Sequence, residues 1–221
     1  QMAVPPEAMR DPGFVYDLAR NYRKSGQASR AAELLATRPA FDRPARYPER
    51  FVAEMLRVAK GASASQATRV ASRIDDLFEP GADISRMSFD LRDDYTSLMW
   101  LGGTKALWTN GDARAAAPLF YRYGAAAQTP QTRSKGFYWA GLAAERAGDG
   151  EAARRYFEQA GQYPDRFYGQ LALGKLGQAI AIPQGDPGIS PSRDQVAAFR
   201  AAPLTRAVEE LARGAPWRTG I

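Results

Sequence analysis

Apolar and polar residues nowhere alternate for long in this chain, so the pattern of a half-buried strand is missing. Near the start, Val15, Leu18, Ala19 and Tyr22 recur at helical spacing and would share one face of a helix. Alanine is abundant and β-branched residues are scattered, which also favours helix. The pattern therefore predicts an all-α protein.

Residues typical of helix ends divide the chain into short segments. Asp11 followed by Pro12 is typical of an N-cap and a first helical residue. Gly26, Gly111 and Gly148 are typical of helix C-termini. Together these signals predict helices at about 12–25, 28–37, 48–60, 65–78, 91–110, 113–127, 131–147, 150–162, 166–176, 193–201 and 204–213.

A change in composition near residue 182 predicts a domain boundary. The segment 182–191 holds three prolines and two glycines, which is typical of a linker or a surface arm. We therefore expect a helical region at 1–181, a linker at 182–192 and the start of a further helical segment at 193–221. Because the chain begins at Gln1 and ends abruptly, we also expect it to be a processed or excised piece.

The helix pairs repeat at an offset of 37, which is the separation of Gly111 and Gly148 (148 − 111). In this register Trp100 aligns with Phe137, and Phe120 aligns with Phe157. An alanine and a large apolar residue also recur at the same distances after Gly26, Gly111 and Gly148. The pairs are Ala31 and Leu35, Ala116 and Phe120, and Ala153 and Phe157. Small residues where helices cross and aromatics between pairs are typical of tetratricopeptide-like repeats. The expected architecture is a superhelical solenoid of antiparallel helix pairs.

The 221 residues include neither cysteine nor histidine. Disulfides, thiolate nucleophiles, zinc sites of the Cys/His kind and histidine-based triads are therefore excluded. The adjacent carboxylates Asp75-Asp76 and Asp93-Asp94 point about 100° apart on a helix, and we expect Asp93-Asp94 to be helix-start charges. No phosphate-binding loop occurs, and Gly102-Gly103 should allow close helix contact instead. We expect no cofactor, no metal and no catalytic residue.

The chain carries 30 Lys+Arg against 24 Asp+Glu, a net charge of +6. This excess suits an anionic partner such as nucleic acid, an acidic membrane face or a carboxylate-bearing polymer. The basic residues are dispersed, however, and no run of five occurs. No apolar run approaches the ~18 residues that a transmembrane helix needs.

One block, from Arg92 to Gly177, is more specific than a generic helical repeat. Its most telling strings are Phe137-Tyr138-Trp139-Ala140-Gly141 and Phe167-Tyr168-Gly169-Gln170-Leu171-Ala172. The block closely resembles the helical superhelix of the soluble lytic murein transglycosylases. The segment from Phe199 to Leu211 is similar to a helix beyond that family's linker. The resemblance is strong over roughly half of the chain and looser over most of it.

The resemblance implies a periplasmic protein that acts on peptidoglycan. Such enzymes cleave the MurNAc–GlcNAc bond without hydrolysis and leave a 1,6-anhydro-MurNAc end. Their catalytic glutamate stands in a Glu-Ser motif of a lysozyme-like domain, and no glutamate of this chain precedes serine. The resemblance therefore implies a non-catalytic superhelix that guides glycan strands and scaffolds a catalytic domain missing from this chain.

Basic and aromatic residues of the same block are candidate contacts with glycan or with the catalytic domain. Helix starts favour anions such as peptide-stem carboxylates, but solvent-facing charge is the more common role of such basic residues. Aromatics at helical spacing usually pack between helices, and the alternative is a stacking platform for sugar rings or bases. These two alternatives apply to Phe137, Tyr138, Trp139, Phe157, Phe167 and Tyr168. The candidates are Arg133, Lys135, Tyr138, Trp139, Arg166 and Tyr168.

Two other functions fit parts of the pattern. A tetratricopeptide-like adaptor would bind a peptide or a protein in its concave face, as the repeat alone suggests. A nucleic-acid-binding solenoid would use the basic balance, with a pI near 9.7. The resemblance favours peptidoglycan over nucleic acid as the partner.

Overall fold

The computed structural model describes residues 5–180 and 190–214 of the chain. Helices, turns and irregular segments make up this described part, which contains no strand. The all-α class predicted from the sequence is confirmed. The chain divides into two compact units, Gln1–Ile180 and Ala181–Ile221. Of the predicted linker at 182–192, residues 182–189 lie outside the described residues.

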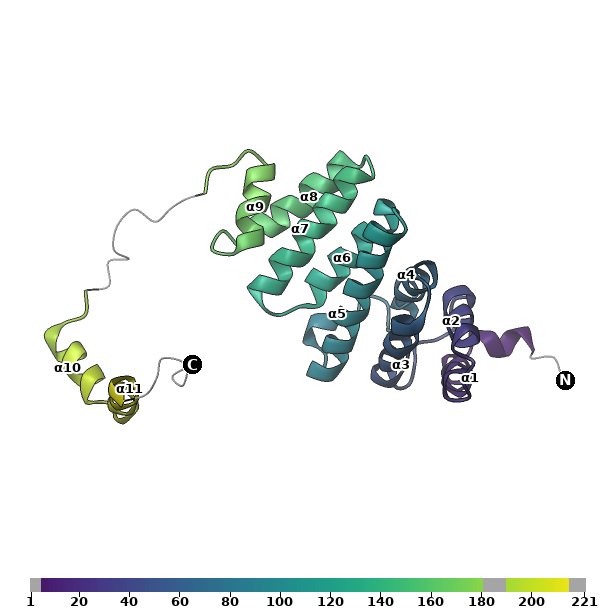
Figure 1. Cartoon of the computed structure of the whole chain (residues 1–221), viewed down its shortest axis with the longest axis horizontal. Coiled ribbons are helices and arrows are strands. Elements are labelled where there is room, and N and C mark those ends of the chain that lie inside the picture. Colours follow the sequence, from purple (N-terminus) through teal and green to yellow (C-terminus); the bar gives the residue numbers. More distant parts are fainter. Residues whose placement is uncertain (1–4, 181–189, 215–221) are drawn as a thin grey trace. The chain divides into compact units, whose positions relative to one another are not determined.

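The helices of the first unit follow one another in chain order (Figure 1). They are α1 (Pro12–Lys24), α2 (Ala28–Thr37), α3 (Pro48–Gly61), α4 (Ala64–Ser72), α5 (Phe89–Thr104), α6 (Ala113–Ala126), α7 (Pro130–Arg146), α8 (Gly150–Gly161) and α9 (Phe167–Lys175). Short 3₁₀ turns span Pro6–Arg10, Asp75–Leu77 and Ile84–Arg86, and a π-helical turn spans Lys105–Thr109. The second unit holds α10 (Arg193–Ala201) and α11 (Pro203–Gly214).

One turn recurs in the first unit and explains why the helix boundaries were predictable. Gly111 and Gly148 have φ of 69° and 78°, a left-handed conformation that glycine adopts without steric cost. Asp112 then accepts a hydrogen bond from the Ala115 N–H at 2.9 Å, and Asp149 caps α8 in the same way. The same short sequence therefore ends one helix and begins the next.

Two helix boundaries differ from the prediction. The helix expected at 65–78 ends at Ser72, because the residues that follow bond to the end of α2. The Arg73 side chain donates to the carbonyl oxygens of Ala36 and Arg38, at 2.9 and 2.6 Å. Secondly, α5 begins at Phe89, where Ser88 is the N-cap. The expectation that Asp93-Asp94 are helix-start charges is wrong, since both lie beyond the first turn.

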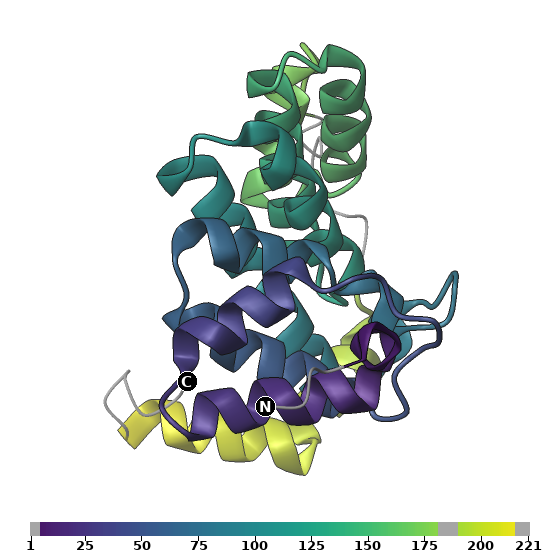
Figure 2. The same cartoon turned by 90° about the vertical axis from the view of Figure 1, so that its right-hand side faces the viewer.

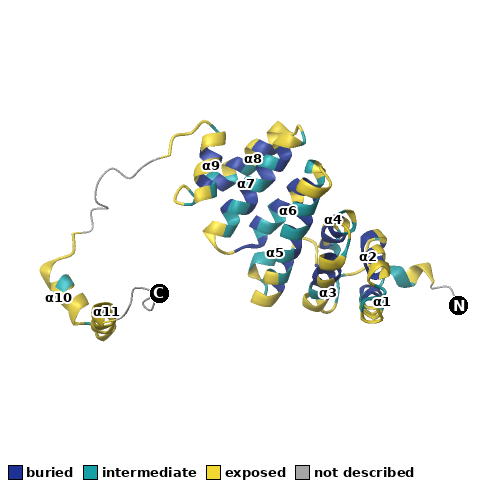
Figure 3. Cartoon of the chain, viewed as in Figure 1, coloured by how far each residue is buried: buried dark blue, intermediate teal, exposed yellow. Residues whose placement is uncertain are grey.

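Each helix of the first unit contacts the next one along the chain, and most also contact the next but one. Figure 2, turned by 90°, shows α1 and α2 lying against each other. Buried residues lie mainly on the helix faces turned toward neighbouring helices, and exposed residues lie on the outer helix faces and at the turns (Figure 3). Among the described residues no helix is long and apolar enough to cross a membrane.

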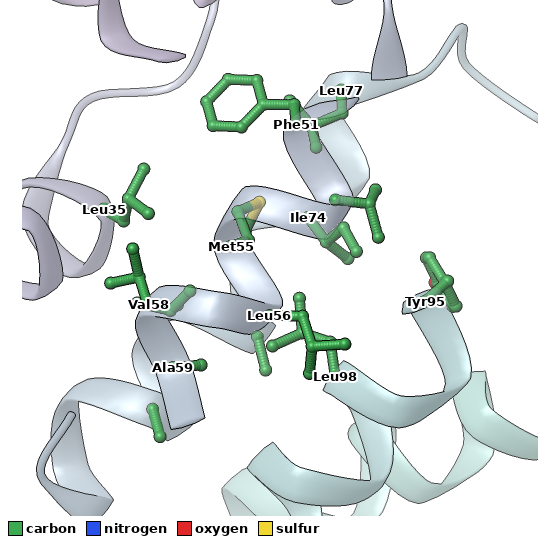
Figure 4. Close-up of a cluster of buried hydrophobic side chains, with 14 of the residues drawn as sticks. Leu35, Phe51, Met55, Leu56, Val58, Ala59, Ile74, Leu77, Tyr95 and Leu98 are labelled. Carbon is green, nitrogen blue, oxygen red and sulfur yellow. The ribbon is translucent and has the colours of Figure 1, made fainter. Parts of the chain in front are cut away.

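Side chains of α3 form the centre of the core in the N-terminal half of this unit (Figure 4). Phe51 and Met55 are fully buried between α2 and the later helices. Leu35 of α2 lies to one side of them, and Ile74, Tyr95 and Leu98 lie to the other. Burying large apolar side chains of this kind contributes about 1.5–3 kcal/mol each.

Two buried ion pairs connect segments that are distant in sequence. Arg38 is buried and donates to both carboxylate oxygens of Asp76, each at 2.7 Å. Glu54 is also buried and accepts from Arg23 of α1, with Nη2 and Oε2 2.9 Å apart. A buried charge is costly unless it is paired, so these contacts fix α1 against α3 and α2 against the turn after α4.

The π-helical turn changes the register of the repeat. A Cβ atom added at Gly103 would lie 2.8 Å from the Phe120 ring, and one at Gly141 would lie 2.6 Å from the Phe157 ring. Gly103 precedes Gly111 by eight residues (111 − 103), whereas Gly141 precedes Gly148 by seven (148 − 141). The extra residue lies in the π-helical turn, which is the usual effect of such a turn.

Trp100 therefore corresponds to Tyr138, and its predicted alignment with Phe137 is wrong. The ring pairs agree, because Trp100 contacts Phe120 with centroids 5.2 Å apart and Tyr138 contacts Phe157 at 5.8 Å. Positions after each glycine do align as predicted. The residues concerned are all buried, at Ala31, Leu35, Ala116, Phe120, Ala153 and Phe157.

The backbones of α6 and α7 meet directly. A Cβ atom added at Gly136 would lie 2.5 Å from the Gly124 Cα, and the neighbouring atoms are backbone rather than flexible side chain. Gly102 is similarly close to Ala71 of α4, at 2.5 Å between Cβ positions. The expectation that Gly102 and Gly103 allow close helix contact is confirmed.

Replacing Gly136 with alanine should therefore lower the free energy of unfolding by about 3 kcal/mol, since a backbone neighbour cannot move aside. Gly150→Ala is the matched control, because its added Cβ meets no atom within 4 Å. The control should change stability by less than about 1 kcal/mol. Urea unfolding followed by circular dichroism measures both. Equal losses in the two variants would contradict direct backbone contact.

Tyr95 gives stability a predictable dependence on alkaline pH. Burial raises the pKa of its phenol above the ordinary value of 10.0, and the nearby Asp75 raises it further. Its contribution to stability is fully present below pH 10 and is lost as pH rises above 10, because the unfolded state releases its proton first. Relative to wild type, Tyr95→Phe should gain about 1.4 kcal/mol per pH unit above pH 10 and nothing between pH 7 and 9. Identical pH profiles in urea unfolding would refute this role.

Candidate functional site

The rings of seven aromatic residues form a half-exposed surface on the C-terminal half of the first unit. We call this surface the aromatic track. It comprises Trp100 of α5, Trp108 of the π-helical turn, Tyr123 of α6, Tyr138 and Trp139 of α7, and Phe167 and Tyr168 of α9.

Neighbouring rings of the track are in contact. Trp108 and Trp139 meet edge to face with centroids 5.0 Å apart. Tyr138 contacts Trp139 at 6.1 Å and Tyr168 at 5.6 Å, and Phe167 continues the series at 5.1 Å from Tyr168. These are favourable distances for aromatic pairs. The contacts connect the π-helical turn, α7 and α9.

Two buried phenylalanines lie beneath the track. Phe120 contacts Trp100 at 5.2 Å, Trp108 at 6.1 Å and Trp139 at 6.2 Å. Phe157 contacts Tyr138 at 5.8 Å. Each of the two buried rings packs against a helical glycine, as described above, so the track rests on the helix crossings and cannot shift independently of them.

The helical period explains which α7 residues reach the track. Lys135, Tyr138 and Trp139 are spaced i, i+3, i+4 and so share one face of α7. Phe137 lies on the opposite face of α7. It is buried and contacts Tyr121 of α6, with ring centroids 5.8 Å apart. Trp108 joins the same surface because the extra π-helical residue rotates the end of α5.

Lys135 contributes the one positive charge that contacts track rings among the described residues. Its ammonium nitrogen lies 3.6 Å from the centre of the Trp100 ring and 5.5 Å from that of Tyr123. Burial lowers the pKa of Lys135, while burial raises the pKa of Tyr123 and Tyr138. The cation–π contact holds this half-buried ammonium over the indole face.

Arg133 and Arg166, also predicted as contacts, make no cation–π contact with a track ring among the described residues. Arg133 donates to the Tyr163 hydroxyl at 2.7 Å and to the carbonyl oxygens of Ala125 and Ala127 at 3.2 and 3.0 Å. Arg166 pairs with Asp165 at 3.0 Å. Because these contacts lie within the chain, Arg133 in particular has a packing role.

Four of the six predicted candidates therefore come together, namely Lys135, Tyr138, Trp139 and Tyr168. Four track residues were not among the predicted site residues, namely Trp100, Trp108, Tyr123 and Phe167, although all four lie in the block from Arg92 to Gly177. The signal that could have found Trp108 is the one-residue difference between the two repeats, which moves it to a new face.

The exposed fraction of each ring decides whether it packs between helices or is available for stacking. Phe137 and Phe157 pack between helices, with 3% and 4% of their surface exposed. Phe167 and Trp108 are 61% and 50% exposed, so the packing alternative is wrong for Phe167. Exposed rings of this kind can stack on the apolar face of a sugar ring. Among the described residues no group of three or more carboxylates is placed to hold a metal ion.

No protein-family model matches the chain, and neither the curated proteins nor the solved structures contain a match.

The contrast between buried and exposed rings can be measured with two substitutions. Phe157→Ala should lower the free energy of unfolding by about 3–5 kcal/mol, since it empties the space against Gly141. Phe167→Ala should cost less than about 1 kcal/mol because that ring is exposed. Denaturant unfolding of the two variants tests this. A loss below ~1 kcal/mol for Phe157→Ala would mean that its ring is free for ligand stacking.

Proposed function

We propose that this chain is the non-catalytic helical superhelix of a periplasmic peptidoglycan lytic transglycosylase. In this role it guides glycan strands and scaffolds a catalytic domain that this chain does not contain. The observation that carries the proposal is the half-exposed aromatic track, in which ring contacts run unbroken from Trp108 to Phe167 over packed helices. A row of such rings suits a polymer of sugar rings, because each ring stacks without needing a particular base or side chain.

The two segments that resemble the transglycosylases, Phe137–Gly141 and Phe167–Ala172, support the helical architecture more directly than they support glycan binding. Gly141 ends the first string and packs on the Phe157 ring, while a Cβ at Gly169 in the second would lie 2.6 Å from the Tyr163 carbonyl carbon. Both glycines are thus required for close packing. The recurring Gly-Asp turn and the buried alanines support a tetratricopeptide-like solenoid as the form of this superhelix.

The scaffolding part of the proposal is supported by the second unit. Leu204, Val208 and Leu211 lie at i, i+4, i+7 on α11, and all three side chains are exposed. A helix of this kind normally buries its apolar face against another protein surface. The same face also suits the alternative function, a tetratricopeptide-like adaptor for a protein partner.

Binding to purified sacculi tests the glycan-guiding function. The double variant Trp108→Ala/Phe167→Ala removes the most exposed rings of the track and should lower retention about tenfold. Phe89→Ala is the matched control, because Phe89 is an exposed aromatic outside the track. The control should bind as wild type does. No variant should release anhydro-muropeptides, since the proposed function is non-catalytic.

Three results would count against the proposal. Unchanged retention of the double variant on sacculi would show that the track does not bind glycan. Release of anhydro-muropeptides by the wild-type chain would show that catalytic machinery is present. Capture of a protein, with no retention by sacculi, would favour the adaptor.

A further inference from the structure

A second candidate site lies far from the track in the fold, between α1 and the segment that leads into α3. It is a cleft with a volume of about 600 Å³. Its walls include apolar surface from Pro12, Pro44 and Phe51. Its charged side chains are those of Asp11, Asp17, Arg43, Arg46 and Arg50, and Tyr16 and Tyr47 add aromatic surface.

The positive charges of the cleft are only partly neutralised. Arg43 forms an ion pair with Asp11. Arg46 and Arg50 are both exposed and form no ion pair with any described residue. Both guanidinium carbons lie near the centre of one ring, that of Tyr47, at 5.4 and 5.1 Å. Two like charges are therefore held on a single aromatic side chain.

An anion beside the Tyr47 ring would offset the positive charge of these two guanidinium groups. A carboxylate is well suited, because guanidinium groups donate to its two oxygens in a fixed planar geometry. The start of α3 lies at the same place, and its N-cap Tyr47 supplies no capping hydrogen bond. The positive end of the helix dipole adds to the attraction, and Glu49 in the first turn offsets part of it.

The cleft also contains negative charge, which restricts the ligand. Asp17 lines it and forms no ion pair within the part of the chain that the structure describes. A neighbouring hollow of about 460 Å³ shares Tyr16 and Arg50 and is lined by both acidic and basic residues. A ligand with charges of both signs suits this mixture of carboxylates and guanidinium groups better than a polyanion such as nucleic acid.

We propose that this cleft binds the free carboxylate end of a short zwitterionic peptide. Arg46 and Arg50 receive the carboxylate beside the Tyr47 ring, and Asp17 receives the ammonium group. The two adjoining hollows provide room for a few residues between these ends. The site is formed by α1, the segment before α3 and the start of α3. The track lies on α5, the π-helical turn, α6, α7 and α9, so a failure of glycan binding there would leave this proposal untouched.

Titration of the full 221-residue chain with small peptides, followed by ¹⁵N NMR, tests the proposal. The probe is trialanine, which carries both end charges. Trialanine amide lacks the carboxylate, N-acetyl-trialanine lacks the ammonium group, and inorganic phosphate supplies negative charge alone. Trialanine should shift signals of α1 and α3, and the amide should bind at least about tenfold more weakly.

Three variants assign the roles. Arg46→Gln/Arg50→Gln should weaken trialanine binding at least about tenfold. Arg30→Gln is the control, because Arg30 is exposed on α2 outside both hollows. It should bind trialanine as wild type does. Asp17→Asn should weaken the binding of trialanine and leave that of N-acetyl-trialanine unchanged. Since all the substituted side chains are exposed, thermal unfolding should be unaffected.

The proposal is overturned if trialanine causes no shifts, or if its amide binds equally well. It is also overturned if Arg30→Gln weakens binding as much as the double variant. Tighter binding of phosphate than of trialanine, together with no effect of Asp17→Asn, would show an anion site without the peptide specificity proposed.

Discussion

The direct contact between the backbones of α6 and α7 is the constraint on which the C-terminal half of the first unit depends. Gly124 and Gly136 leave no side chain between the two helices at this point, so the two backbones are in direct contact. This approach fixes the position of α7, and with it the face that carries Lys135, Tyr138 and Trp139. Aromatic side chains then fill the space between successive helices.

The aromatic residues of the C-terminal half fall into two groups, which differ in how deeply their rings are buried. Phe120 and Phe157 are buried on glycines and stabilise the helix crossings. Trp108 and Phe167 extend outward from the same clusters and leave half or more of their surface to solvent. Because the outer rings rest on the inner ones, a ligand that stacks on the track meets a rigid surface and pays little entropy for ordering it.

The net positive charge does not form one basic surface. Arg38, Arg73 and Arg133 direct their guanidinium groups to backbone carbonyls and to buried partners, where they serve packing. Arg46 and Arg50 differ, since both remain exposed beside one tyrosine ring. At these five positions arginine serves packing or a local cluster, and not the continuous basic stripe that nucleic acid needs.

Local signals in the sequence determined most helices and their ends, because caps such as Asp112 and turns such as Gly111 act within a few residues. They also indicated the buried alanines and the aromatic character of the site. Only the tertiary structure decided that α4 ends at Ser72, where Arg38 binds Asp76 across 38 positions. It alone separated exposed Phe167 from buried Phe157 and placed Trp108 against Trp139. These outcomes depend on contacts between distant segments, which no local pattern of residues encodes.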